Sequence, residues 1–553
     1  MKLNTSFPPT RTKRQSEKER EWSLGTSLVP RFPEKVTGKS CGINVFLRSD
    51  LDEYKLIKMP LTLLHIATFL SVLLLHLSLT SSTKQSSKPH IVFIVADDLG
   101  WDDVSFHGSN QIPTPNIDKL ANDGIILNNY YVSPICTPTR SAIMTGRHPI
   151  HTGMQSGVIL AAQPYGLGLN ETLMPQYLKE LGYSTHGVGK WHLGFFKFDY
   201  TPTKRGFDSF FGYWSGKEDY WDHSSDAPGQ GWGLDLHNNT ENDFTEWGMY
   251  STDLFTTLAV DVIQSHDPSK PLYLYLPHQA VHSANAIQPL QAPEKLIKKF
   301  KNIEDERRRI YAAMVTALDD SVGKVRDALV AKGLYNNSVI IFTTDNGGPA
   351  AGFDLNMASN FPLRGVKATL WEGGVRGAAF VHSPLLASKG RVSLDLMHVT
   401  DWLPTFGKSS PRQELLHNIH PSGGEAAMRY GQWKIIMNAG KGWNGWYPPP
   451  GYEETTVSNK TLKNAVVTCG QPPSSPPECT KSAGPCLFDI EHDPCEYVNL
   501  ASQHDDIVQK LLAKLEDYRK SSVPPRNKPI DPKANPKYHG GAWVAWEDQL
   551  RAD

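Results

Sequence analysis

The chain has 553 residues, of which 39% are hydrophobic and 20% are charged, and this exceeds the roughly 100–200 residues of a single domain. Two globular domains are therefore expected. The formal net charge of −1 gives no electrostatic basis for nucleic-acid binding, so no nucleic-acid partner is expected and anion recognition would require a locally positive site.

An apolar segment lies well inside the N-terminal region. Residues 61–79 are apolar apart from Thr, Ser and two His, and small polar residues follow, which is typical of a secretory signal. We interpret 59–82 as a signal peptide that begins at Met59, and 1–58 as an unstructured extension or a start-site artefact. The alternative is an uncleaved signal anchor, because the segment has about the 20 residues that cross a bilayer. Only that alternative would make a membrane a partner.

From about residue 88, short β-branched runs alternate with amphipathic stretches. This pattern predicts an α/β domain over 88–405, built on a large, mainly parallel sheet with helices on both faces. A long helix is predicted over 305–329, because Ile310, Met314, Leu318 and Val322 share one stripe. The predicted strands are Ile91–Ala96, Ser184–Val188, Leu272–Leu276, Val339–Thr343 and Ala378–Val381.

Polar side chains follow the first four predicted strands. A single Asp after a strand is more often a turn or cap residue, and a single Lys or His in a loop is more often solvated. The carboxyl ends of parallel strands meet at one edge of a sheet, however, so these residues are expected to converge. Three carboxylates and one amide are hard ligands that suit Ca²⁺ or Mg²⁺. The residues are Asp97, Asp98, Lys190, His192, His282, Asp345 and Asn346.

Cys136 lies just before a short predicted helix over 138–144. Taken alone, it is most simply a buried core cysteine. Its position at a helix N-terminus would, however, favour an anion at this side chain.

The C-terminal part, residues 412–553, is rich in Pro, Gly and aromatic residues and is predicted to form a smaller domain with a short antiparallel sheet and a helix over about 505–520. Four clustered cysteines in an exported chain predict two disulfides, with three possible pairings. They are Cys469, Cys479, Cys486 and Cys495. Sequons predict glycosylation at Asn170, Asn238, Asn336 and Asn459. Together these features favour the secretory pathway, with a lysosomal or extracellular destination.

The sequence blocks of residues 88–405 resemble the sulfatase family, of the arylsulfatase B type, which are N-acetylgalactosamine 4-sulfatases. The resemblance rests first on Cys136-Thr137-Pro138-Thr139-Arg140, which is similar to the family signature for conversion of cysteine to formylglycine. Thr139 departs from the commonest signature, which has Ser there. The other blocks are Ala96–Gly100, Gly189–Gly194, Arg205–Asp208, Val281–His282, Thr344–Gly348, Pro362–Lys367 and Trp371–Gly374.

The resemblance implies an alkaline phosphatase/sulfatase-like fold and hydrolysis of sulfate esters on sugars of glycosaminoglycan type. It implies that a formylglycine-generating enzyme converts Cys136, and that Asp97, Asp98, Asp345, Asn346 and the modified Cys136 bind one Ca²⁺. It further implies that Arg140 and His192 orient and activate the nucleophile, that Lys190 and Lys367 hold sulfate oxygens, and that His282 protonates the leaving oxygen. Lys190, His282 and Lys367 would thus be the substrate-binding residues.

One departure affects the junction between the two predicted domains. Relatives of this type have a helix and a connecting stretch between an Asp-Trp-Leu-Pro-Thr block and a Ser-Pro-Arg block, whereas here Thr405 is followed almost directly by Ser410. We interpret the missing tens of residues as a splice form or a gene-prediction error. Two alternatives remain open: a phosphatase or phosphodiesterase of the same superfold, if Cys136 stays a thiol, and a non-catalytic anion-binding protein, owing to the shortened junction.

Overall fold

The computed structural model describes residues 86–405, 412–421, 424–440, 442–452, 462 and 464–549. The predicted N-terminal extension and signal segment, residues 1–58 and 59–82, lie outside this range. The described residues belong to one compact unit of the chain, Ser81–Asp553. Among them, no helix is both long enough and apolar enough to span a bilayer.

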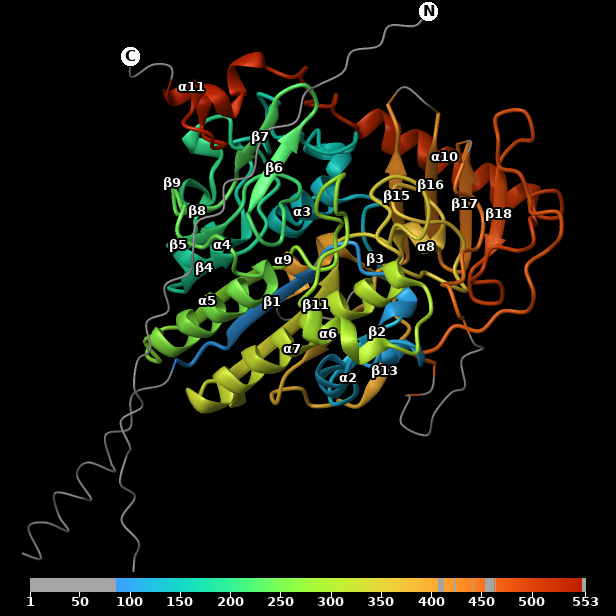
Figure 1. The fold of residues 1–553 in the computed structure, drawn as a ribbon. Helices are drawn as coiled ribbons and strands as arrows, with labels where there is room; N and C mark the ends of the chain where they lie inside the picture. The colour runs from blue at the N-terminus through green and yellow to red at the C-terminus, as the bar shows by residue number, and fades with distance from the viewer. Residues whose placement is uncertain are drawn as a thin grey trace, which may run out of the picture. The chain divides into compact units, whose positions relative to one another are not determined.

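The predicted strands form the centre of a ten-stranded sheet (Figure 1) with the order β13–β2–β12–β11–β1–β10–β4–β5–β8–β9. The strands from β11 to β5 run parallel, whereas β12 and β8 pair antiparallel with their neighbours, so the sheet as a whole is mixed. The bounds are β1 (His90–Ala96), β2 (Ile125–Leu127), β4 (Ser184–Val188), β5 (Ser209–Gly212), β8 (His237–Asn238), β9 (Glu241–Asn242), β10 (Leu272–Pro277), β11 (Ser338–Thr344), β12 (Ala379–His382) and β13 (Arg391–Ser393).

Helices cover both faces of this sheet, as predicted. Alternate side chains of a strand point to opposite faces, so Val92 and Ile94 pack with α2, α5, α6 and α7, while Phe93 and Val95 pack with α3, α4 and α9. The bounds are α2 (Pro115–Asn122), α3 (Cys136–Thr145), α4 (Met174–Glu180), α5 (Ser251–Ser265), α6 (Glu294–Ile297), α7 (Glu306–Ala331), α8 (Glu372–Val375), α9 (Trp402–Thr405) and α11 (Trp546–Gln549).

The long predicted helix is α7. Its N-cap is Asp305, whose side chain accepts a hydrogen bond from the backbone N–H of Arg308, and this satisfies one of the free donors at the helix start. Met314, Leu318 and Val322 are buried in the core, so the predicted stripe faces the sheet. α7 and α5 lie side by side over the same face (Figure 1).

The C-terminal part contains the predicted antiparallel sheet and helix. The helix α10 (Asp505–Ser521) buries Val508, Leu511 and Leu515 against the sheet. Two disulfides join Cys469 to Cys495 and Cys479 to Cys486, which resolves the three possible pairings. The sheet has the order β15 (Glu414–Ile419), β16 (Ala426–Tyr430), β17 (Trp433–Met437) and β18 (Cys486–Asp489). Smaller strands elsewhere are β3 (Tyr130–Tyr131), β6 (Ser224–Ala227), β7 (Gly231–Leu234) and β14 (Met397–His398).

The two parts are packed against each other at several places. After α10 the chain returns to the α/β part, where Trp543 and Trp546 join the core that contains Phe93. At the shortened junction, residues 406–411 lie outside the described range, and Arg412 forms an ion pair with Asp401 across it. The junction is thus bridged by side chains in the described residues on either side.

A buried ionic network also links the two parts. The Nζ atom of Lys434 on β17 lies 2.9 Å from a carboxylate oxygen of Glu372, at the start of α8, and 2.9 Å from one of Glu496. All three side chains are buried. Burial raises the pKa of Glu496 to about 7, whereas Lys434, Arg376 and Arg429 outweigh burial and lower the pKa of Glu372.

We predict that Lys434→Met lowers the free energy of unfolding by about 3–5 kcal/mol, because two buried carboxylates lose their shared cation. Chemical denaturation of the full chain measures this difference. The matched control is Lys119→Met, since Lys119 pairs with Asp123 at 3.0 Å on the exposed face of α2. That change is expected to cost less than about 1 kcal/mol. Equal losses in the two variants would contradict a stabilising role for the buried network.

Candidate active site

The polar residues that follow the central strands converge at one edge of the sheet. Asp97 and Asp98 continue β1, Lys190 follows β4, His282 follows β10 and Asp345 follows β11. Each of these residues is at most 3% exposed, so the site is an enclosed cluster of charged groups. Buried charges are retained only when they are paired or bind an ion or ligand, so this concentration marks a functional site.

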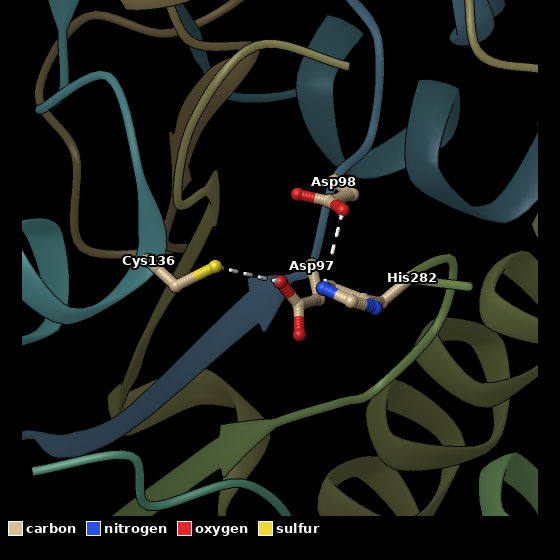
Figure 2. Close-up of side chains that lie close together, drawn as sticks. All are labelled: Asp97, Asp98, Cys136 and His282. Atoms are coloured by element: carbon tan, nitrogen blue, oxygen red, sulfur yellow. Dashed lines mark hydrogen bonds and ion pairs between the residues drawn. The ribbon is translucent and has the colours of Figure 1, made fainter. Parts of the chain in front are cut away.

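Cys136 reaches this cluster from the start of α3. The helix begins at Cys136, two residues earlier than predicted, and ends before Gly146, whose φ of 63° closes it in a left-handed turn. The Sγ atom points at Asp97 and lies 3.8 Å from its Oδ1 (Figure 2). Burial raises the pKa of the Cys136 thiol far above its usual range, so the unmodified side chain is a neutral thiol.

Three cations surround the carboxylates. Lys190 Nζ lies 2.6 Å from Asp97, and Lys367 Nζ lies 2.7 Å from Asp98. Arg140 donates two hydrogen bonds, from Nε and Nη2, to Oδ2 of Asp345, and its Nη1 atom has no partner among the described residues. The sequence predicted all three cations, and the structure brings them together. With a divalent cation bound beside them, they would supply the local positive charge that an almost neutral chain needs for an anionic ligand.

His282 lies directly beside the carboxylates. Its Nε2 atom is 3.4 Å from Asp98 Oδ2, and Figure 2 shows the ring beside both aspartates. Its Nδ1 faces the carbonyl oxygen of Ser283 at 2.6 Å, so Nδ1 carries the proton and Nε2 is the free nitrogen of the neutral ring. Burial, followed by Lys367 and Lys190, lowers the pKa of His282 well below its usual value.

Asp354 is a site residue that sequence reasoning missed. Its Oδ2 lies 3.1 Å from Lys367 Nζ and 3.7 Å from His282 Nε2. Burial alone would raise its pKa, but Lys367 and Lys217 outweigh burial and lower the pKa of Asp354. The residue belongs to a loop without a recognisable motif, so no sequence signal pointed to it.

His192 is held beside the cluster in a different way. Its Nε2 donates to the carbonyl oxygen of Ile159 at 2.9 Å, which leaves a buried Nδ1 with no partner among the described residues. His192 and Asp98 have φ values of 58° and 60°, a left-handed conformation that is uncommon for residues with a side chain. Such strain is typical of functional sites, where surrounding contacts hold the backbone in place.

The donor set fits a divalent cation. Asp97, Asp98, Cys136 and His282 each offer an atom within 4.8 Å of the others. Asn346 donates its amide N–H to Asp98 at 2.7 Å and leaves its buried Oδ1 without a partner, which is the kind of oxygen that a hard cation takes. Burial and the Asp345 charge raise the pKa of Asp97 to about 8 despite Lys190 and Arg140. A cation would relieve this uncompensated negative charge.

Two further sets of residues are the aromatic residues at 213–221 and the predicted sequons. Of the aromatic residues at 213–221, Tyr213, Trp214 and Tyr220 are fully buried and serve packing, while Trp221 is partly exposed. The sequon residues Asn170, Asn238 and Asn336 are exposed, and Asn459 lies outside the described residues.

The geometry and the sequence together define the class of this protein. The family profile described as Sulfatase matches residues 89–408, more than half of the chain, and the chain belongs to this family. It is therefore a sulfatase, an enzyme that hydrolyses sulfate esters, as the sequence predicted.

Relatives confirm the family but not the narrower type. The chain is 42% identical over 514 residues to Arylsulfatase J of Mus musculus, in an alignment that covers 84% of this chain and 81% of that protein. It is 31% identical over 345 residues to N-acetylgalactosamine-6-sulfatase of Mus musculus, which covers 57% and 61%. Ps i-CgsB in complex with k-i-k-neocarrahexaose has a similar fold, with a TM-score of 0.63, 28% identity and coverage of 80% of this chain and 94% of that one. None of these three is named a 4-sulfatase, so that prediction is not supported.

Proposed function

We propose that this sulfatase removes sulfate from sulfated sugars with a formylglycine made from Cys136 and one bound Ca²⁺. The observation that carries the proposal is the position of Cys136, buried at the first turn of α3 and 3.8 Å from Asp97, among the site's three cations. Formylglycine supplies a hydrated aldehyde whose hydroxyl is the nucleophile, and the cation supplies positive charge to the sulfate oxygens. Asp97, Asp98, Asp345, Asn346 and the modified Cys136 would hold the cation.

The side chains of this protein would bind and orient the ester. Lys190 and Lys367 are point charges that suit the oxygens of a tetrahedral anion, whose negative charge grows in the transition state. Arg140, fixed by two hydrogen bonds to Asp345, presents its unpaired Nη1–H for the same purpose. The start of α3 adds backbone N–H groups and the positive end of the helix dipole.

The two histidines would move protons at defined atoms. His282 keeps its proton on Nδ1 through Ser283, so Nε2 is the atom that takes up and hands over a proton to the leaving oxygen. Lys367 Nζ lies 3.2 Å from that nitrogen and is the adjacent donor. His192 holds its proton on Nε2, so its Nδ1 is the free base of that ring.

A metal-dependent phosphatase or phosphodiesterase is the rival enzyme. Such enzymes commonly use two metal ions about 3.5–4 Å apart. The described residues contain one cluster with suitable ligands, that of Asp97, Asp98, Cys136 and His282. This single cluster supports the sulfatase mechanism over the two-metal alternative.

The mass of the tryptic peptide that ends at Arg140 tests the proposal, together with hydrolysis of 4-nitrocatechol sulfate. Protein from cells that convert cysteine to formylglycine is expected to carry the aldehyde at Cys136 and to hydrolyse the ester. An unaltered thiol in such material would overturn the proposal. Aldehyde without hydrolysis would instead favour the non-catalytic anion-binding protein that the shortened junction suggested.

The substrate class rests on the relatives' names. One relative is an N-acetylgalactosamine-6-sulfatase and one solved structure holds a neocarrahexaose. These names support a sulfated carbohydrate as the substrate of this chain, of glycosaminoglycan type or a related galactose-containing chain. The formylglycine-generating enzyme would be a partner during biosynthesis.

We also propose a secretory route that ends in the lysosome or outside the cell. Two disulfides and three exposed sequons in the described residues support it. Glycans are proposed at Asn170, Asn238 and Asn336, and at Asn459, where the structure offers no test. Release of N-linked glycans by an amidase, read as a loss of mass, checks these positions.

In an acidic compartment, three histidines near the domain junction are expected to lower the stability of the chain. His148, His398 and His417 lie together near the domain junction, where His398 and His417 are buried and His148 is partly buried, and the rings of His148 and His398 are stacked 5.4 Å apart. Burial, helped by the Arg412 charge at His148 and His398, lowers the pKa of His148 to about 3 and that of His398 well below its usual value. Burial followed by Lys434 does the same for the pKa of His417.

We predict that stability falls as the pH drops below about 6.5. Below that value the unfolded histidines bind protons while the folded ones do not, so each costs about 1.4 kcal/mol per pH unit until its folded pKa is reached. Chemical denaturation at pH 7 and pH 5 measures the loss, which is expected to be about 2 kcal/mol per histidine. His417→Leu should reduce this pH-dependent loss of stability by the contribution of one histidine, because neither ring nitrogen of His417 has a partner in the described residues. An unchanged difference between the two pH values would contradict this assignment.

A further inference from the structure

A groove next to the active site is lined by exposed aromatic side chains. Its cavity has a volume of about 570 Å³ and is formed by the β6–β7 hairpin (Figure 1), the loop at 243–250 and the loop after His282. Trp232 is 45% exposed, Phe244 62% and Trp247 79%, and all three line the groove. Large aromatic residues are rarely left open to solvent in one place unless they bind a partner or ligand.

The groove is connected to the catalytic cluster by two short segments. Asn285 lines the groove and is three residues beyond His282, so their Cα atoms are at most about 11 Å apart. Asp222 also lines it and is six residues beyond Gly216, where an added Cβ would lie 2.9 Å from the ring of His192, a span of at most about 22 Å. Tyr220 donates its hydroxyl to the carbonyl oxygen of His282 at 2.9 Å, which ties the two segments together.

In contrast to the sulfate site with its three cations, the groove is lined by acidic side chains. Its acidic lining residues are Asp222 and Asp243, and each uses Oδ1 to accept a hydrogen bond from the backbone two residues ahead. No lysine or arginine is among the lining residues in the described part of the chain. The lining His223 is buried and faces Glu218 at 3.5 Å, so the two carboxylates disfavour an anionic ligand and favour a ligand that donates hydroxyl hydrogens.

We propose that this groove is a subsite for an uncharged sugar of the same chain whose sulfated sugar occupies the Lys190–Lys367 site. The C–H face of a sugar ring would stack on Trp232 and Trp247, where its slightly positive hydrogens meet the negative aromatic face. Hydroxyl groups of the ring would donate to Asp222 and Asp243. The inference rests on the proposed function and narrows it: the substrate is an oligosaccharide with a neutral neighbour, and chains with uronic acid at that position are poor substrates.

The test compares three substrates on the full chain: 4-nitrocatechol sulfate, a sulfated tetrasaccharide of galactose and N-acetylglucosamine, and a sulfated tetrasaccharide that alternates hexosamine with uronic acid. The wild type is expected to prefer the neutral chain. In Trp232→Ala with Trp247→Ala, the kcat/KM ratio of neutral tetrasaccharide to aryl sulfate should fall about tenfold, mainly through KM. In Asp222→Asn with Asp243→Asn, the kcat/KM of the uronic acid tetrasaccharide should move closer to that of the neutral tetrasaccharide.

The matched control is Tyr177→Ala on α4, because Tyr177 is 43% exposed and does not line the groove. It should leave the ratio unchanged. If the double tryptophan variant still hydrolyses aryl sulfate and keeps the wild-type kcat/KM ratio of neutral tetrasaccharide to aryl sulfate, the proposed subsite is wrong, but the proposed function is not affected. No hydrolysis of any ester by the wild type would refute the proposed function instead. In that case, binding of the unsulfated neutral tetrasaccharide, measured by quenching of tryptophan fluorescence, still tests the subsite. Quenching in the wild type that is lost in the double tryptophan variant would support the subsite. No quenching in the wild type would overturn it.

Discussion

Cys136→Ala is expected to reduce hydrolysis of 4-nitrocatechol sulfate by about a thousandfold or more, because it removes the atom from which the nucleophile is made. The side chain is buried but small, so the free energy of unfolding should change by only about 1 kcal/mol. Activity of equal amounts of purified protein and a thermal melt of each measure the two effects. A loss of activity with an unchanged melt places the defect in the chemistry.

Thr139→Ser is the control variant, in which activity is expected to rise rather than fall. The commonest form of the signature has Ser at this position, so the variant is expected to raise the fraction of Cys136 converted to the aldehyde. The hydroxyl of Thr139 accepts from the backbone N–H of Ser133 at 2.9 Å, and serine keeps that contact. Retention of more than about a tenth of the activity in Cys136→Ala would contradict a nucleophile derived from Cys136.

The central strands and their polar ends were predictable from the sequence. A buried parallel strand is often a continuous apolar run, so β1, β10 and β11 were located to within one residue, while the more polar Ser184–Val188 was located with its correct bounds. The direction of β12 was not predictable, because a strand of only four residues has the same sequence pattern whether it pairs parallel or antiparallel. This short strand and those at the far edge make the sheet mixed.

The candidate site was predictable where residues follow strands or belong to sequence blocks of the family, as Cys136, Arg140 and Lys367 do, and not where a loop carries neither signal. Asp97, Lys190 and Asp345 converge because parallel strands end at one edge. Asp354 reaches Lys367 only through the path of a loop, which no local pattern specifies. The groove aromatics likewise come from segments whose sequence carries no periodic signal, and only their shared exposure reveals them.

Lys190→Ala is expected to lower kcat/KM for 4-nitrocatechol sulfate by about a hundredfold to a thousandfold. Lys190 is fully buried with its Nζ 2.6 Å from Asp97, so its charge is not screened by water and acts strongly on a nearby anion. Lys190→Arg should recover little of the activity, since a planar guanidinium does not fit the space of a point charge. Steady-state kinetics of the three proteins measure these effects.

Inhibition by inorganic sulfate shows whether Lys190 binds the sulfate group or only neutralises the charge of Asp97. If Lys190 holds sulfate oxygens, the inhibition constant of sulfate rises in Lys190→Ala along with the loss of kcat/KM. If Lys190 only neutralises Asp97, activity falls while sulfate inhibits as in the wild type, and its proposed role is wrong. Lys179→Ala is the matched control, because Lys179 forms an equally short ion pair of 2.6 Å with Asp208 but is half exposed on α4. An exposed pair contributes at most about 1 kcal/mol, so neither activity nor sulfate inhibition should change.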